Sequence, residues 1–250
     1  MVWGTTGYSY DGTDLKTLAY HVSVFADQRP GMSGGVISYA NEHGVRLSGR
    51  RYLGPRQFTV GLVLFPQNTS GVQTVTSLEH IQANAETLKK LFWSSSATKD
   101  FVKTMPDGDV RTIEARVENV QTQRNQTGVV ARMAVTMFAP YPIWAGAAQS
   151  YLNQTGSFSA VNNGDLPAAD LTIHFDTAGR ITHNPSGAYL ESDTANLTVN
   201  IKDHTIKVAS TDRHDALTYN KEWWMEVEPG SNSMTVNSGT VDLTFNHGWD

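Results

Sequence analysis

The sequence predicts a mainly β protein with two β-sandwich domains, the first of which carries one flanking α-helix. Most segments alternate apolar and polar residues, whereas a single segment has helical periodicity. Only 17% of the residues are charged, against about 25% in a typical globular protein, and Asn, Thr, Ser and Gly take their place. The length of 250 residues suits two domains, because a domain usually contains about 100 to 200 residues.

The strands of the first half are predicted from period-2 patterning, which places one face on a core and leaves the other polar. The stretches with this pattern are 18–24, 58–64, 113–118 and 131–137. A polar stretch over residues 121–128 separates the last two and is typical of a hairpin loop.

One helix is predicted from a stripe of apolar residues spaced three and four apart. The stripe consists of Leu78, Ile81, Ala85, Leu88 and Phe92. Thr76 and Glu79 have the spacing of a capping box at its start, and Lys89 and Lys90 lie in its last turn, where cations favour the helix dipole. We expect the stripe to pack against a sheet.

A long glycine-rich stretch, Asp27–Pro55, lies between the first two strands. Long connections inside compact domains are usually functional or mobile, and we expect part of this one to be a hairpin and part to reach outward. Arginine suits bidentate pairing with carboxylates across an interface. The predicted subunit-contact residues are therefore the arginines late in this stretch or just after it, with solvation on a hairpin as the alternative: Arg46, Arg50, Arg51 and Arg56.

The domain boundary is predicted between residues 148 and 149. Two prolines interrupt the strand pattern in the segment 139–146, and proline cannot donate to a sheet ladder. The polar stretch 149–157 follows. The domains are then 1–148 and 149–250, and the short strands and polar turns of the second are typical of a β-sandwich.

No catalytic, metal or cofactor site is expected. The chain has no cysteine, which excludes thiolate chemistry and disulfides. Ser33 lies in a G-x-S-x-G pattern, but the strand before it and the helix after it that a nucleophile elbow needs are not predicted. His204, Asp212 and His214 could meet in space, yet exposed turns are the favoured interpretation. We therefore expect a protein that is not an enzyme.

The pair Trp223 and Trp224 is a second candidate site. Adjacent residues of a strand point to opposite faces, so one tryptophan is expected in the core. The other is interpreted as an inter-domain contact or, less favoured, a platform for stacking a sugar.

Several short motifs follow one another in a definite order over nearly the whole chain. Asn162–Asp165 opens the second half, and the aromatic strand at Trp223 leads into the turn Pro229–Asn232. A final strand reaches Trp249. The first half adds a Gly-Pro-Arg entry at Arg56 and the exit segment around Pro142. In this order and spacing, the motifs resemble those of the phage distal tail protein family.

The resemblance implies a tail-tube-like first domain and a galectin-like second domain. It implies a homo-hexameric ring at the distal end of a siphophage tail, assembled in the host cytoplasm and joining the tail-tube protein to tail-tip, fibre or receptor-binding proteins. The first domain would line a channel through which DNA passes without specific binding, which suits a net charge of −5. No membrane insertion is expected, since no apolar run approaches the length of a bilayer. The alternative is a carbohydrate-binding β-sandwich adhesin.

Overall fold

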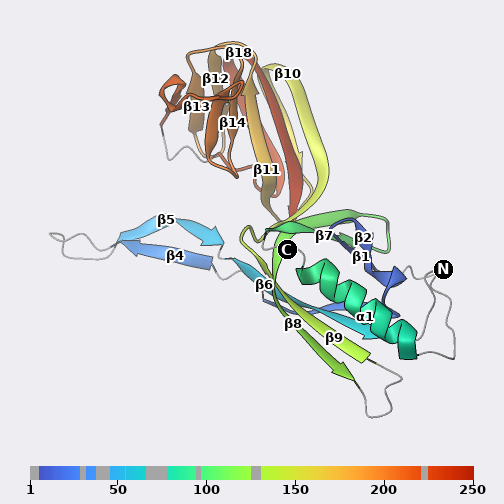
Figure 1. Cartoon of the computed structure of the whole chain (residues 1–250). Coiled ribbons are helices and arrows are strands. Elements are labelled where there is room, and N and C mark those ends of the chain that lie inside the picture. Colours follow the sequence, from blue (N-terminus) through green and yellow to red (C-terminus); the bar gives the residue numbers. More distant parts are fainter. Residues whose placement is uncertain are drawn as a thin grey trace. The chain divides into compact units, whose positions relative to one another are not determined.

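The computed structural model divides into two compact units, Met1–Pro142 and Ile143–Asp250 (Figure 1). It describes residues 6–28, 32–37, 46–53, 55–65, 78–93, 97–124, 131–220 and 225–250. Strands dominate both units, as the fold class predicts. The chain passes from one unit to the other after Pro142, slightly before the predicted boundary at 148/149.

The main sheet of unit 1 is antiparallel throughout and runs in the order β2-β1-β7-β8-β9-β6-β3. Residues 110–115 of β8 pair with β7, and residues 116–124 pair with β9, with a register shift between Val117 and Asn119. Such irregularities bend a strand, so β8 belongs to both parts of the sheet. The elements are β1 (Gly7–Tyr10), β2 (Thr13–Asp14), η1 (Leu15–Thr17), β3 (His21–Gln28), β6 (Arg56–Leu64), β7 (Lys99–Thr104), β8 (Val110–Arg124) and β9 (Ala131–Ala139).

The predicted helix is α1 (Leu78–Trp93), which lies over β6, β8 and β9 (Figure 1). The stripe residues Ile81, Ala85, Leu88 and Phe92 are buried as predicted. Phe92 also stacks on Tyr10 with ring centroids 5.2 Å apart. Every second residue of β6 and β9 is buried as well. The core of the unit lies between helix and sheet, and it includes Phe58, Val60, Leu62, Met133, Val135 and Met137.

The predicted hairpin within Asp27–Pro55 is present. β4 (Met32–Ile37) and β5 (Arg46–Leu53) form an antiparallel sheet of their own. Among the strands that the structure describes, these two pair only with each other.

Unit 2 is a sandwich of two antiparallel sheets that share a long strand pair. β10 and β18 pair along their lengths, with register shifts between Tyr151 and Gly156. The first part of β18 also pairs with β12, and its second part pairs with β11. The elements are β10 (Trp144–Asn162), β11 (Leu166–Phe175), β12 (Gly179–His183), β13 (Ala188–Ser192), β14 (Leu197–Asn200), β15 (Thr205–Val208), β16 (Thr211–Asp212), η2 (His214–Ala216), β17 (Leu217–Tyr219) and β18 (Gly230–Trp249).

The polar stretch 149–157, predicted to follow the domain boundary, runs inside β10. Backbone hydrogen bonds to β18 hold this strand, and they do not depend on apolar side chains. The apolar side chains of the unit gather between its two sheets instead, among them Phe175, Ile181, Leu190, Val199, Met234 and Leu243.

Candidate interaction surfaces

The face of the β3-β6-β9-β8 layer that α1 does not cover is hollowed. Its residues alternate with the buried ones, so they point away from the helix. The hollow has a volume of about 350 Å³. The side chains that line it include Ser23, Phe25, Val63, Gln121, Gln123 and Arg132.

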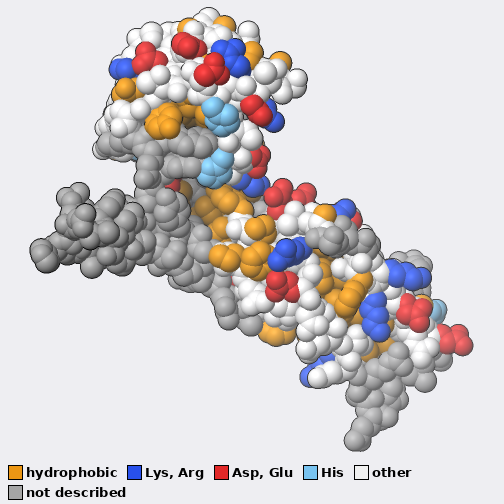
Figure 2. All heavy atoms as spheres, turned by 60° about the vertical axis from the view of Figure 1, so that its left-hand side comes forward, with side chains coloured by type: hydrophobic (Ala, Val, Ile, Leu, Met, Phe, Trp, Pro, Cys, Tyr) orange, Lys and Arg blue, Asp and Glu red, His pale blue; other side chains and the backbone are white. Residues whose placement is uncertain are grey.

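Amide, hydroxyl and aromatic groups dominate this uncovered face, and its charges are mixed. The side chain of Glu118 accepts a hydrogen bond from Gln57 at 3.0 Å and lies 3.7 Å from Arg116. The guanidinium of Arg116 also lies over the ring of Phe138, 4.8 Å from its centroid. Figure 2 draws one side of the whole molecule, and basic and acidic side chains are interspersed among its described residues as well. The described residues of this surface form no continuous basic track for a phosphate backbone.

Strand β3 forms an open edge of the layer. It pairs with β6 on one side and with no other described strand. Two exposed aromatic side chains lie at this edge: Phe25 within β3 is 50% exposed, and Tyr20, directly before β3, is 55% exposed. Soluble proteins usually protect long edge strands, so this one is a candidate for pairing with another chain.

The predicted subunit-contact arginines fall into two groups. Arg46, Arg50 and Arg51 lie on the backbone of β5, and their side chains are outside the described part. Arg56 is 3% exposed and forms a bidentate ion pair with Asp27, with both N–O distances 2.6 Å. Arg56 is thus engaged inside its own chain, while the contact role of the β5 arginines stays a prediction.

The other predicted aromatic site, Trp223 and Trp224, lies outside the described residues. Its flanking residues Met225 and Val227 are buried. The segment that follows the pair therefore belongs to the core of unit 2.

The turn Pro229–Asn232 is built around one buried amide. Asn232, 3% exposed, accepts a hydrogen bond from the Glu228 amide at 3.0 Å and donates to the Glu228 carbonyl at 2.7 Å. Its Oδ1 also lies 3.3 Å from Nε2 of buried His183. Burial lowers the pKa of His183, while the hydrogen bond to Asn232 and the charge of Glu228 act in the opposite direction. The motif serves the architecture of the turn.

The Asn162–Asp165 motif has a similar structural role. The side chain of Asn162 is fully buried; it donates to the carbonyls of Leu166 and Val227 and accepts from the amide of Gly164. The amide of Asn163 donates to Nδ1 of His247 at 3.1 Å. Two of the motifs behind the resemblance, Asn162–Asp165 and Pro229–Asn232, thus join separate backbone segments through hydrogen bonds.

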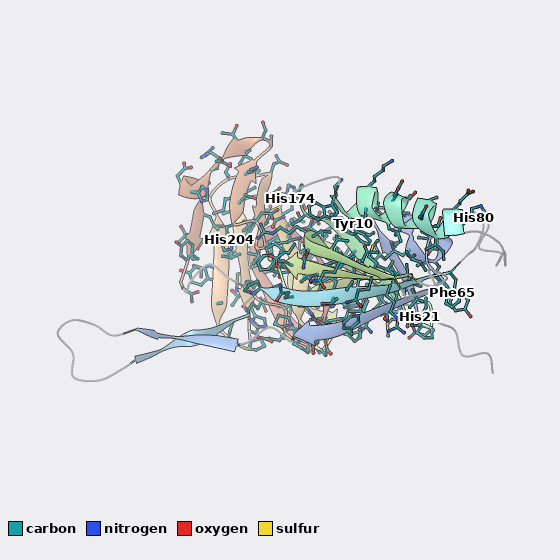
Figure 3. The ribbon with its side chains drawn as sticks, turned by 60° about the horizontal axis from the view of Figure 1, so that its bottom comes forward. Tyr10, His21, Phe65, His80, His174 and His204 are labelled. Carbon is teal, nitrogen blue, oxygen red and sulfur yellow. The ribbon has the colours of Figure 1, made fainter. Side chains whose placement is uncertain are left out.

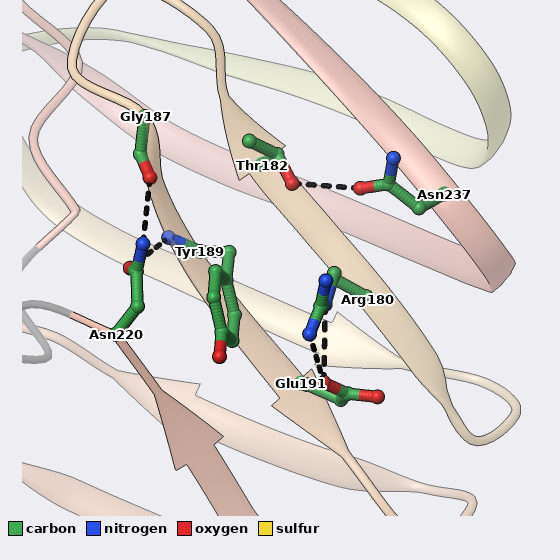
Figure 4. A network of polar contacts seen from close by, with 7 residues as sticks. All are labelled: Arg180, Thr182, Gly187, Tyr189, Glu191, Asn220 and Asn237. Atoms are coloured by element: carbon green, nitrogen blue, oxygen red, sulfur yellow. Dashed lines mark hydrogen bonds and ion pairs between the residues drawn. The ribbon is translucent and has the colours of Figure 1, made fainter.

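The outer face of β12, β13 and the first part of β18 carries cross-strand polar pairs (Figure 4). Arg180 forms an ion pair with Glu191 at 2.6 Å and lies over the ring of Tyr189, 3.9 Å from its centroid. Thr182 donates to Asn237 at 2.7 Å. These side chains bond to one another across the strands, which is typical of a solvated sheet face.

Of the histidines labelled in Figure 3, His21 lies in β3, His80 in α1 and His174 in β11, while His204 lies in the turn between β14 and β15. Within the described ranges, no group of three or more His, Cys, Asp or Glu residues could hold a metal ion. His204, Asp212 and His214 are all exposed near turns. Ser33 lies inside β4 opposite Tyr52 rather than at a strand-to-helix turn. No described helix is long and apolar enough to span a bilayer.

No protein-family model and no curated protein matches the sequence. Solved structures do match. The crystal structure of the SPP1 Dit (gp 19.1) protein, described as a paradigm of the hub adsorption apparatus in phages that infect Gram-positive bacteria, is 16% identical. The match covers 98% of this chain and 99% of that chain with a TM-score of 0.65. A chain from the tail of an empty GTA particle, refined with C6 symmetry, is 12% identical over 48% of this chain and 73% of that one, with a TM-score of 0.25.

The SPP1 Dit match spans both units in one alignment, so it concerns their order along the chain as well as each fold. Along nearly its whole length the chain has the fold of the SPP1 Dit protein, and the predicted resemblance to phage distal tail proteins is confirmed at the level of the fold.

Proposed function

We propose that this chain is a structural protein of a phage tail that forms a ring at the distal end. The ring joins the tail tube to the tail-tip or receptor-binding apparatus. The observation that carries this proposal is the end-to-end match to the SPP1 Dit protein, which covers 98% of this chain and 99% of that chain. One shared domain would not indicate the function, because a single fold can serve many functions. Two domains of the same folds in the same order restrict the range of functions.

The uncovered face of unit 1 supports a place for this unit around a channel. One face of the β3-β6-β9-β8 layer is covered by α1, and the other is hollowed and polar. Its mixed charges would let DNA pass, since each phosphate neutralised by a cation adds affinity and slows movement. In this arrangement the uncovered face lines the channel, and specific binding to DNA is not expected.

The edge strand β3 supports assembly by continued sheet pairing. Repeated head-to-tail contacts between identical subunits close into a ring when the rotation between neighbours closes. The unpaired edge of β3 presents backbone donors and acceptors to such a neighbour. The β4–β5 sheet, with its three arginines, is the second proposed contact, either in the same ring or in a stacked one.

The partners follow from this position. A hexameric ring would bind the tail-tube protein on one side and tail-tip, fibre or receptor-binding proteins on the other. It would assemble in the host cytoplasm and remain in the virion. No enzymatic activity belongs to this role, and Ser33, inside β4, is not expected to act as a nucleophile.

The test is the mass and shape of the purified full chain. Multi-angle light scattering over a range of protein concentrations should give a hexamer, and negative-stain microscopy should show rings with an open centre. A chain that stays monomeric at the highest concentration, and also in the presence of the tail-tube protein, would contradict the proposal. A monomer that binds a glycan array would instead favour the adhesin.

A further inference from the structure

The stretch between Asp27 and Arg56 leaves the main sheet of unit 1 and returns to it. Strand β3 ends at Gln28, the β4–β5 sheet follows, and β6 begins at Arg56. Asp27 and Arg56 are 29 positions apart in the chain, yet their side chains meet. Asp27 lies where the chain leaves the main sheet, and Arg56 lies where it returns. We call these two residues, together with the carbonyl of Pro142, the neck.

The contacts at the neck are directional. Nε of Arg56 donates to Oδ1 of Asp27 and Nη2 donates to Oδ2, each at 2.6 Å. The remaining terminal nitrogen, Nη1, lies 3.4 Å from the Pro142 carbonyl oxygen. The planar guanidinium therefore sets both the distance and the relative orientation of its partners, which the point charge of a lysine does not.

The burial of Arg56 in this partly buried ion pair indicates that geometry is the pair's main contribution. The side chain of Arg56 is 4% exposed and that of Asp27 is 31% exposed. Desolvation offsets much of the attraction in buried pairs, so apolar replacements of similar volume are often neutral or stabilising. A register shift between Phe25 and Gln28 accompanies the pair at the end of β3, and such shifts re-aim side chains.

The described strands of the hairpin form no ladder with the other described strands of unit 1. Within the described strands, β4 and β5 pair with each other alone. A long excursion held at its base by a two-point contact has far fewer orientations than one joined by the chain alone.

We propose that Asp27 and Arg56 are positioning residues for assembly: the neck holds the β4–β5 sheet at the angle at which it meets a neighbouring subunit. The inference rests on the proposed function for the identity of the partner, which is a second copy of this chain. The orienting effect on the hairpin exists in the single subunit and can be measured there.

The first experiment measures that effect without assembly. Because the chain has no cysteine, spin labels can be attached at Ser48→Cys in β5 and Gln121→Cys in β8, and pulsed electron resonance then gives their distance distribution at a concentration where the chain is monomeric. We expect Arg56→Lys, which keeps the charge and loses the fork, to broaden the distribution about twofold. The paired replacement of Arg56→Met with Asp27→Leu should broaden it as well and should keep the fold.

The second experiment measures assembly of the same variants by light scattering. Each should need about tenfold more protein than the parent to form the ring, in line with the loss of a geometrically demanding charged pair. The matched control is Arg180→Met with Glu191→Leu, an ion pair on unit 2, which should leave the distance distribution and the assembly unchanged.

The outcomes separate the two proposals. If the distance distribution between the spin labels has the same width in the neck variants as in the parent, whether narrow or broad, the positioning role is overturned. Broadening in variants of a parent that never forms rings leaves the positioning effect intact and removes the proposed function. Rings that form at the parent's concentration despite broadening show that the hairpin is not the contact, and they overturn the role in assembly.

Discussion

The ring of Phe25 occupies the space that a side chain at position 61 would need. Gly61 lies across from Ser23 in the β3–β6 pair, and a Cβ at Gly61 would stand 2.5 Å from Cε1 of Phe25 and 3.2 Å from Oγ of Ser23. A cross-strand aromatic ring is known to compensate for a glycine inside a sheet. The exposed Phe25 is therefore part of the construction of the uncovered face.

This relationship predicts coupling between the two positions. Phe25→Ala should destabilise the parent more than it destabilises a Gly61→Ala background, by about 1 kcal/mol in a double-mutant cycle. In that background the ring is already displaced, so its removal loses less contact. Urea unfolding of the four proteins measures the coupling, and additive effects would show that the ring and the glycine are independent.

The amide of Asn232 should be a large contributor to the stability of unit 2. Asn232→Ala removes a buried amide that is the partner of the Glu228 amide and of three backbone carbonyls, which should cost about 2 to 3 kcal/mol. The control is Asn184→Ala, an exposed amide that bonds hydroxyl groups of β18 and should cost under about 1 kcal/mol. Equal losses in thermal unfolding would contradict a special role for the turn.

The stability of unit 2 should depend on pH through His183. Burial lowers the pKa of His183 below its usual 6.5, so the unfolded chain takes up a proton at higher pH than the folded chain. The stability is then fully present above about pH 6.5 and falls as the pH drops below it. His183→Gln should flatten this decline when the melting temperature is followed between about pH 7.5 and 5. The exposed His214→Gln is the control, and an unchanged slope in His183→Gln would count against the assignment.

The limits of unit 2 predict which fragment folds alone. Residues 143–250 keep all of β10, whereas residues 151–250 lose the part of β10 that pairs with the end of β18, including Trp144 opposite Trp249. We expect the longer fragment to unfold cooperatively and the shorter one to melt at a lower temperature or not cooperatively. Circular dichroism with calorimetry measures both. Equal melting would show that residues 143–150 are dispensable.

The periodic patterns were sufficient for the core of unit 1. Phe58, Val60 and Leu62 alternate along β6 and Ile81 and Leu88 recur along α1, and all are buried as the patterns predict. A repeat of two or of about four residues reports which side chains share a face, and in both elements one face is covered. The mainly β fold class followed from the same signal.

The long β10 strand could not be found from such a pattern. Its burial is irregular and much of it is exposed, because β18 holds it through the backbone and its bends move side chains between faces. A polar sequence such as Gln149–Ser157 then looks like a linker, which is why the boundary was predicted at 148/149, whereas the compact units divide after Pro142. Strand pairing with a partner far along the chain has no local signature.

What the sequence by itself determined is the class of structure, since alternation, helical spacing and the absence of cysteine are properties of the chain alone. The role of single polar residues was decided only by the tertiary structure. Arg56 is read as a surface charge until folding places Asp27 beside it, and Asn232 is an ordinary turn residue until burial makes its amide necessary. A charge or an amide acquires its role from the dielectric environment and partners around it, and in this chain those partners come from positions distant in sequence.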